Sequence, residues 1–232
     1  MKRVVLSWSS GKDSAWSLHV LRQDPHLEVV GLLTTLNEAF DRVAMHAVRR
    51  ELLEAQAEAA GLPLQVVPIP WPCSNEQYER IMAEVCVRAR VAGVEAVAFG
   101  DLFLADIRAY RERQLDGTGL EPLFPLWNLD TRVLARDMIA GGLRAKLTCV
   151  DPKRLASSFA ARDFDQQLLD ELPAGVDPCG ENGEFHSFVY AAQVFGRTIP
   201  VRMGEIVARD GFVFADVLQE DREGGNKAAS SG

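Results

Sequence analysis

The N-terminal segment constrains the fold of this chain most strongly. Residues 3–14 read Arg-Val-Val-Leu-Ser-Trp-Ser-Ser-Gly-Lys-Asp-Ser, an apolar run that stops at small hydroxyl residues, one glycine and one lysine. The apolar run predicts a buried strand, and residues 15–21, with Leu18 and Leu21 on one face, predict a helix. The turn between them predicts an anion site, because the first amides of a helix lack backbone partners and its dipole favours negative charge.

The side chains of this turn suit a phosphate group. Lys12 offers a positive charge with donor protons, and small residues around Gly11 let backbone amides approach an anion closely. The hydroxyl groups belong to Ser9, Ser10 and Ser14. A Walker A loop is excluded, because it would require a glycine where this chain has Leu6. The alternative is an ordinary strand, turn and helix with a solvated lysine.

Composition limits the classes of protein. The 232 residues are 47% hydrophobic and 25% charged, which is typical of a globular protein with one large α/β domain or a domain with a smaller appendage. The net charge of -8 argues against a basic groove for nucleic acid. The 4 cysteines form no Cys-x-x-Cys pair, and no apolar run is long enough to span a bilayer. We therefore expect a cytoplasmic protein without a membrane partner.

Strands and helices alternate through the first half of the chain. Strands are predicted at residues 27–35, 64–68 and 94–99, and helices at residues 44–60 and 75–91. This alternation predicts an α/β fold with a doubly wound parallel sheet. Ligands bind such sheets at the carboxyl ends of the strands, where the N-terminal loop, Thr34, Thr35 and Asp101 would converge.

The pattern changes after about residue 125. A helix is predicted at residues 131–140, a strand at 143–150, partial helix at 155–172, and short strands from 185 onward. We therefore expect a nucleotide-binding domain at 1–125 and a smaller α+β domain at 126–221. Residues 222–232 have too few apolar side chains to bury, which predicts a disordered tail.

A second segment rich in functional groups follows at residues 179–186, with the sequence Cys-Gly-Glu-Asn-Gly-Glu-Phe-His. It brings two carboxylates, an amide and an imidazole into one short loop. Taken alone, it could be a polar turn that leads into a strand at 185–191. Cys179 has no paired histidine motif, which favours a thiol without a role in catalysis.

Together, the two segments point to a known family. The loop resembles the PP-loop, Ser-Gly-Gly-Lys-Asp-Ser, of the N-type ATP pyrophosphatase superfamily, which cleaves ATP between the α and β phosphates; Ser10 replaces its first glycine. A non-glycine residue there must fit an ordinary backbone region or accept mild strain. With Gly-Glu-x-Gly-Glu-Phe-His, the chain is similar to the diphthine-ammonia ligase family over residues 3 to about 218. The similarity includes Thr34-Thr35, Met45-His46, Gly100-Asp101 and Pro125-Leu126-Trp127.

The resemblance implies an adenine nucleotide α-hydrolase-like fold and an ATP-dependent amide ligase. In this chemistry a substrate carboxylate is adenylated, pyrophosphate and AMP are released, and ammonia is transferred. Family members in archaea and eukaryotes amidate diphthine, a modified histidine on elongation factor 2. The implied ligands are therefore ATP, Mg²⁺, ammonia and a carboxylate acceptor.

The resemblance also implies roles for individual residues. The catalytic candidates are Lys12, Glu181, Glu184 and His186. The candidates for ATP binding are Ser9, Ser10, Gly11, Lys12, Asp13, Ser14, Thr34, Thr35 and Asp101. Asp13 and Asp101 are also the candidates for Mg²⁺, and His46, Trp127, Gly180 and Asn182 are those for the acceptor. The alternatives are a helix cap for Asp13, a turn for Asp101, a cap or surface role for His46 and a core role for Trp127.

Two other functions compete. A tRNA-thiolating pyrophosphatase would require a basic surface and usually paired cysteines, which this chain lacks. A non-catalytic nucleotide-binding module of the same fold loses the reactive loop, whereas Lys12, Asp13 and Ser14 are intact here. The sequence is compatible with a homo-oligomer but does not define the oligomeric state, and it does not identify the acceptor.

Overall fold

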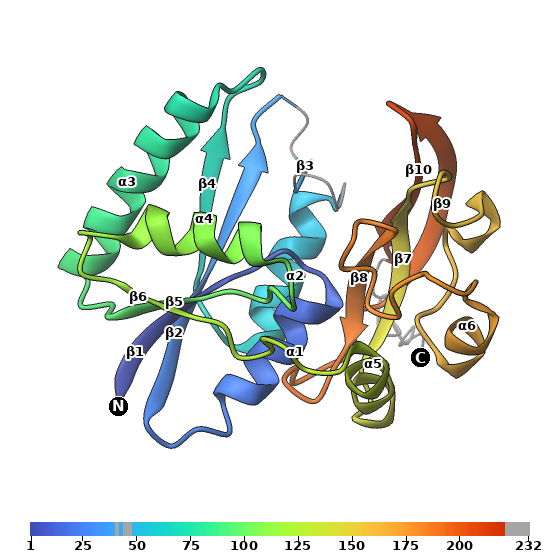
Figure 1. Cartoon of the computed structure of the whole chain (residues 1–232), viewed down its shortest axis with the longest axis horizontal. Coiled ribbons are helices and arrows are strands. Elements are labelled where there is room, and N and C mark those ends of the chain that lie inside the picture. Colours follow the sequence, from blue (N-terminus) through green and yellow to red (C-terminus); the bar gives the residue numbers. More distant parts are fainter. Residues whose placement is uncertain (40–41, 44–47, 221–232) are drawn as a thin grey trace, which may run out of the picture.

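The computed structural model describes residues 1–39, 42–43 and 48–220. Figure 1 shows two β-sheets side by side, one formed by the first half of the chain and one by the second half. His46 and the tail at residues 222–232, about which the sequence makes predictions, lie outside the described residues. In the described part, no helix is long and apolar enough to cross a membrane.

The first sheet is parallel and doubly wound, as predicted. Its parallel strands are β1 (Lys2–Ser7), β2 (Leu27–Asn37), β4 (Leu64–Ile69), β5 (Ala96–Ala98) and β6 (Glu121–Leu123). They lie in the order β4-β2-β1-β5-β6, and the short β3 (Arg42–Val43) pairs antiparallel with the end of β2. The direction of the chain through the sheet therefore reverses between β1 and β5. This reversal opens a crevice at the carboxyl ends of these two strands.

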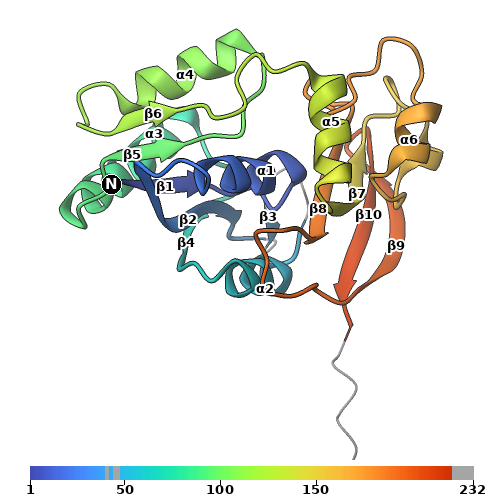
Figure 2. The ribbon, with the colours of Figure 1, turned by 90° about the horizontal axis from the view of Figure 1, so that it is seen from below.

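Alternation along β1 explains why helices cover both faces of this sheet. Val4 and Leu6 point to one face and pack in the same apolar cluster as residues of α1 (Lys12–Leu21) and α2 (Arg50–Ala60). Val5 points to the other face, where α3 (Asn75–Val91) and α4 (Ala105–Leu115) supply the neighbouring apolar residues. Figure 2 shows α3 and α4 on one side of the sheet and α2 on the other.

The second sheet is antiparallel, with strand order β8-β7-β10-β9. Its strands are β7 (Arg144–Val150), β8 (Phe185–Ala191), β9 (Val201–Arg209) and β10 (Phe212–Gln219). It is accompanied by α5 (Thr131–Ala140), the 3-10 helix η1 (Ser157–Phe159) and α6 (Gln166–Glu171). The largest apolar cluster includes Leu6 of the first sheet and Leu147 of the second, so one core joins the two sheets.

Most predicted elements are confirmed, and the differences have physical causes. The helix at 75–91 is present, and Ser74 forms the capping box that fixes its start. The helix expected from residue 44 is described only from Arg50, since residues 44–47 are outside the described part. The polar helix α4 and the three-residue strand β6 were not predicted, because α4 buries only Leu115 and β6 is too short to show a period.

Candidate functional site

The loop between β1 and α1 leaves the start of α1 without a side-chain cap from its N-cap residue. Gly11 is the N-cap of α1, and no side chain caps this helix end. Ser14 Oγ donates to the Gly11 carbonyl at 2.9 Å and lies 3.2 Å from Ser9 Oγ. The Lys12 amide lies 3.2 Å from Ser187 Oγ of β8, which ties the loop to the second sheet. This helix start has the backbone arrangement that the sequence analysis expects of an anion site.

Ser10 has a left-handed backbone, with φ at +68°. The sequence left open whether this residue would be strained, and the structure shows that it is, at a cost of about 1 kcal/mol. Its buried carbonyl oxygen accepts two hydrogen bonds, from the Val189 amide at 3.0 Å and from Gln56 Nε2 at 3.0 Å. These bonds hold the loop in the strained conformation, so the loop shape depends on the second sheet.

Gln56 supports this loop, and the sequence analysis did not identify it. It is fully buried in α2, and its Oε1 accepts from Trp8 Nε1 at 2.9 Å. Its Nε2 also donates to the Val189 carbonyl at 2.6 Å. Gln56 therefore connects the loop, α2 and β8 through one amide. A glutamine among the apolar residues of a predicted helix was the signal that could have revealed it.

Lys12 is charged but enclosed. Its side chain is only 3% exposed, and Nζ lies 2.9 Å from Asp13 Oδ2. Nζ is also 5.4 Å from the ring centroid of Phe185 and 5.8 Å from that of Phe164. Burial alone would lower the pKa of Lys12, but Asp13 and other nearby acidic groups outweigh it, and the pKa is raised. The ammonium group therefore stays protonated at neutral pH.

Asp13 and Asp101 are brought together by Gly100. A Cβ at Gly100 would lie 3.1 Å from the carbonyl carbon of Asp13 and 3.2 Å from the Ser14 amide nitrogen, so any larger residue would crowd the backbone of α1. Asp13 Oδ1 and Asp101 Oδ2 are both buried without a hydrogen-bond partner. Burial raises the pKa of both carboxyl groups. Such unpartnered carboxylate oxygens are the ligands that Mg²⁺ prefers.

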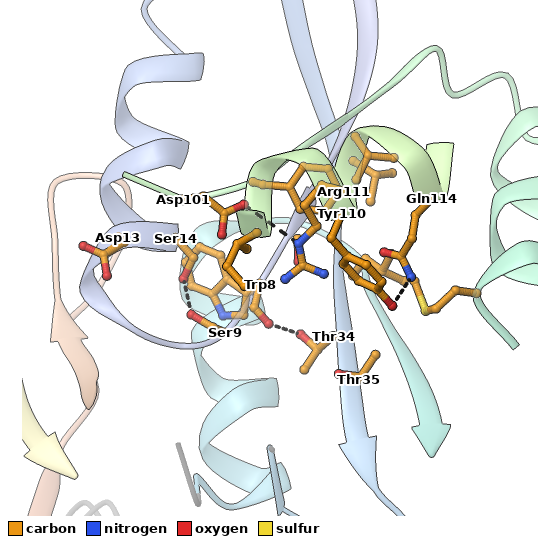
Figure 3. A pocket seen from close by; sticks show the side chains of 18 of the residues that line it. Trp8, Ser9, Asp13, Ser14, Thr34, Thr35, Asp101, Tyr110, Arg111 and Gln114 are labelled. Carbon is orange, nitrogen blue, oxygen red and sulfur yellow. Dashed lines mark hydrogen bonds and ion pairs between the residues drawn. The ribbon is translucent and has the colours of Figure 1, made fainter. Parts of the chain in front are cut away.

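Arg111 of α4 faces Asp101 across the same crevice. Its Nε lies 3.8 Å from Asp101 Oδ2, and its guanidinium carbon lies 5.1 Å from the ring centroid of Phe99. Figure 3 shows Arg111, Asp101 and Thr34 around one pocket, with Asp13 on the far side of Ser14. The sequence analysis did not name Arg111, because it had not predicted the helix that carries it.

The loop at residues 179–186 is held in shape by carboxylates and glycine. Asp177 Oδ2 accepts from the amides of Cys179 at 3.2 Å and Glu181 at 2.9 Å. Gly180 has φ at +70°, and a Cβ there would lie 2.8 Å from the Phe185 carbonyl oxygen. This position therefore requires glycine, both for its backbone angle and for lack of space.

Glu181 connects this loop to the first sheet. Its Oε1 accepts from the Leu102 amide at 2.7 Å, in the segment that follows β5. Burial raises the pKa of Glu181 to about 7, although the bond from Leu102 acts in the opposite direction. His186 behaves differently, since burial, assisted by the charge of Lys12, lowers its pKa to about 4. At neutral pH the imidazole is therefore uncharged, and the Glu181 carboxyl is poised to gain or lose a proton.

Three predicted acceptor residues of the described chain do not line the pocket. Glu184 is buried, and its Oε1 accepts from the Asp177 amide and from Asn182 Nδ2, each at 3.1 Å. Its side chain therefore organises the loop from within. Trp127 lies instead against Phe124 and below the Arg108 guanidinium, whose carbon is 4.8 Å from the Trp127 ring centroid. The predicted acceptor-side residues that do not line the pocket are therefore Glu184, Asn182 and Trp127.

Most of the remaining predicted residues line one cavity of about 940 Å³, although Ser10 and Gly11, which were predicted to bind ATP, are not among them. It runs from the two loops into the space between the sheet and helices α3 and α4. The predicted residues that line it are Ser9, Lys12, Asp13, Ser14, Thr34, Thr35, Asp101, Gly180, Glu181 and His186. The expectation that both loops face a common pocket is thus confirmed. Within the described residues, no group of three or more His, Cys, Asp or Glu side chains forms a metal site.

Comparison with known proteins agrees with this geometry. The family model for the diphthamide synthase N-terminal domain matches residues 1–122, and the model for the C-terminal domain matches residues 130–218. A diphthine–ammonia ligase from Danio rerio is 28% identical over 241 residues, covering 93% of this chain and 92% of that protein. The human diphthine–ammonia ligase is 26% identical over 241 residues, covering 93% of this chain and 88% of its own length.

A longer relative also matches. The diphthine–ammonia ligase of Schizosaccharomyces pombe is 27% identical over 219 residues, which cover 86% of this chain and 36% of that protein. The fold and pocket define a doubly wound α/β protein with an anion site at its first helix and a second, antiparallel sheet. With both family models matched over most of its length, the chain belongs to the diphthamide synthase family.

Proposed function

We propose that this protein is an ATP-dependent amide ligase of the diphthine–ammonia ligase type. It would adenylate a carboxylate, release pyrophosphate and AMP, and transfer ammonia to the activated carbonyl. The observation that supports this most directly is the shared cavity, with the Lys12 loop on one wall and the Gly180 and Glu181 segment on the other. A cavity of about 940 Å³ has room for a nucleotide together with part of an acceptor.

The two halves of the cavity suit the two halves of ATP. The triphosphate would lie at the start of α1, where the helix amides are uncapped and Lys12 is protonated. The nucleoside would lie between the sheet and the two helices that cover it. The apolar wall there includes Val5, Leu33, Met82, Val85 and Val97, and its polar groups include Tyr110 and Gln114.

Mg²⁺ fits the pair Asp13 and Asp101. Each offers a buried oxygen without a hydrogen-bond partner. Mg²⁺ in nucleotide sites is commonly held by one or two carboxylates and completed by phosphate oxygens and water, so two acidic residues would suffice to hold it. When bound, the ion would neutralise charge on the phosphates. Its removal should therefore weaken ATP binding and abolish turnover.

The chemistry divides between the two walls. An oxygen of the acceptor carboxylate would attack the α phosphorus, and the bond to pyrophosphate would break. Lys12 and the amides at the start of α1 would stabilise the departing charge. Ammonia would then attack the acyl carbon, AMP would leave, and Glu181 would take the excess proton. Its pKa of about 7 suits a group that gains and loses a proton near neutral pH.

The remaining loop residues would shape the acceptor side. Gly180 lets the chain turn beside Phe185, and His186 contributes an uncharged imidazole to the pocket wall. Glu184 and Asn182 would act indirectly, by holding the loop in its conformation. The acceptor that the relatives' name suggests is diphthine, and we propose that it is carried by elongation factor 2 in the cytoplasm.

The proposal is tested with purified protein, ATP, Mg²⁺, ammonium chloride and diphthine-bearing elongation factor 2. We expect formation of the amide, seen by mass spectrometry, together with equal amounts of AMP and pyrophosphate. Lys12→Ala should lower the rate about 100-fold to 1,000-fold, as expected when one preorganised charge-stabilising group is lost. Failure to turn over ATP with this acceptor would argue for another carboxylate. Failure to bind ATP at all would refute the nucleotide site.

A further inference from the structure

We propose that Arg111 is a second cationic residue for the nucleotide phosphates, and that it exchanges its ion pair with Asp101 for an ion pair with the phosphates. This inference rests on the proposed function, since it assumes that ATP occupies the cavity. Arg111 belongs to α4, which lies outside both sequence motifs. It is nevertheless part of the cavity wall, next to the carboxylate that follows β5.

The charges around the loop require such a residue. Lys12 already pairs with Asp13 at 2.9 Å, and its side chain is enclosed by two aromatic rings. Asp101 and Glu181 add further acidic groups to the cavity lining. A triphosphate that enters here would meet more carboxylates than free positive charge. Another cation close to the loop would remove this conflict.

The contact between Arg111 and Asp101 is loose. Arg111 Nε and Asp101 Oδ2 lie 3.8 Å apart, which is too far for a hydrogen bond and too close for a bridging water. Both atoms are buried and have no hydrogen-bond partner. Breaking this contact would therefore sacrifice no hydrogen bond. Once the Arg111 side chain turns away from Asp101, a phosphate oxygen would supply the acceptor that Nε lacks.

Packing keeps Arg111 available for this exchange. Its guanidinium lies on the Phe99 ring, with the guanidinium carbon 5.1 Å from the ring centroid. This stacking holds the side chain in place while its N–H groups can still face the cavity. Figure 3 shows the side chain reaching into the pocket on the side of Thr34 and Asp101. A planar guanidinium can bind phosphate through two parallel hydrogen bonds, which a lysine cannot do. The exchange would leave Asp101 free to serve as a ligand for Mg²⁺.

The test measures the affinity for ATP by calorimetry in EDTA, without Mg²⁺. Arg111→Gln should weaken ATP binding about 10-fold to 100-fold, the effect of losing a charge-assisted hydrogen-bond pair. Asp101→Asn should leave ATP binding unchanged or make it several-fold tighter, because it removes a competing negative charge. Arg111→Lys should restore part of the loss. Adenosine, which lacks phosphate, should bind all of these variants as it binds the original protein.

Arg108→Gln is the matched control. Arg108 lies on the same helix and also stacks on aromatic rings, at 4.7 Å from the Phe124 centroid, but it does not line the cavity. It should bind ATP with unchanged affinity. Thermal unfolding of every variant shows whether the protein remains folded.

The two explanations of Arg111 predict opposite results. If the ion pair with Asp101 were only structural, Arg111→Gln and Asp101→Asn would weaken ATP and adenosine binding in the same direction, which would overturn the proposal. Unchanged ATP affinity in Arg111→Gln would also overturn it, while leaving the ligase function intact. An original protein that binds no ATP would overturn both the inference and the proposed function.

Discussion

Gly100→Ala tests whether the nucleotide site depends on the close contact between Gly100, after β5, and the start of α1. The added Cβ would lie 3.1 Å, 3.2 Å and 3.3 Å from backbone atoms of Asp13 and Ser14. All three neighbours are backbone atoms, so no flexible side chain can move aside. Overpacking of this kind typically costs about 1–3 kcal/mol of unfolding free energy. It should also push the start of α1 away from Asp101, which would weaken ATP binding.

The assay combines urea unfolding with ATP titration. Gly196→Ala is the control, because a Cβ there would meet only the Ala59 carbonyl oxygen at 3.7 Å, an ordinary contact. We expect Gly196→Ala to lie within about 0.5 kcal/mol of the original protein. If Gly100→Ala behaved like this control in both stability and ATP affinity, the reasoning about the strand end would be refuted.

Three further predictions concern buried polar groups. Gln56→Leu should lower the unfolding free energy by about 2–5 kcal/mol, since the substitution leaves Trp8 Nε1 and the Val189 carbonyl without this partner. Urea unfolding measures the loss, and Gln166→Leu, at an exposed position, is the control. Burial raises the pKa of Glu181 from 4.5 to about 7. The carboxyl therefore ionises more readily in the unfolded chain, and its contribution to stability, present at low pH, is lost as pH rises from about 4.5 through 7. Glu181→Gln should therefore gain stability relative to the original protein between pH 5 and 8, by about 1–2 kcal/mol after solvent screening, and a constant difference would contradict this. His186, whose pKa is lowered to about 4, has the opposite sign: its contribution is present above pH 6.5 and is lost as pH falls toward 4, so His186→Asn should remove this acid-side loss in the same unfolding series.

The sequence predicted the strand, turn and helix around Lys12 well, and the reason is local. An apolar strand, a turn of small residues and a helix start are defined by neighbours in the chain, so the loop around Lys12 has the predicted form. Asp101 could be placed for the same reason, because parallel strands end at one edge of their sheet. The capped helix α3 likewise follows from signals within its own segment.

The acceptor half was harder to predict, because side-chain directions in an irregular loop follow no period. Glu184 and Glu181 are three residues apart, yet one bonds within the loop and the other reaches the segment after β5. Trp127 was placed near the pocket from its motif, but its ring packs against Phe124. The roles of these residues depend on tertiary contacts between the two sheets, which no local pattern encodes.

The residues that the sequence missed share a cause. Gln56 and Arg111 act across long separations in the chain, the first through Val189 and the second through Asp101 and the cavity. Ser10 could be recognised as a departure from the motif, but its left-handed backbone depends on bonds from α2 and β8. Contacts between residues this far apart in the sequence can be seen only in the folded structure.

The central claim, activation of a carboxylate as an adenylate, is tested most directly by isotope transfer. The acceptor carboxylate of diphthine on elongation factor 2 is labelled with ¹⁸O and incubated with the protein, ATP, Mg²⁺ and ammonium chloride. The account predicts one ¹⁸O atom in AMP for each amide formed, with unlabelled pyrophosphate, because the oxygen that attacks the α phosphorus leaves with AMP. Formation of ADP with ¹⁸O in inorganic phosphate would instead show attack at the γ phosphorus and would contradict the account.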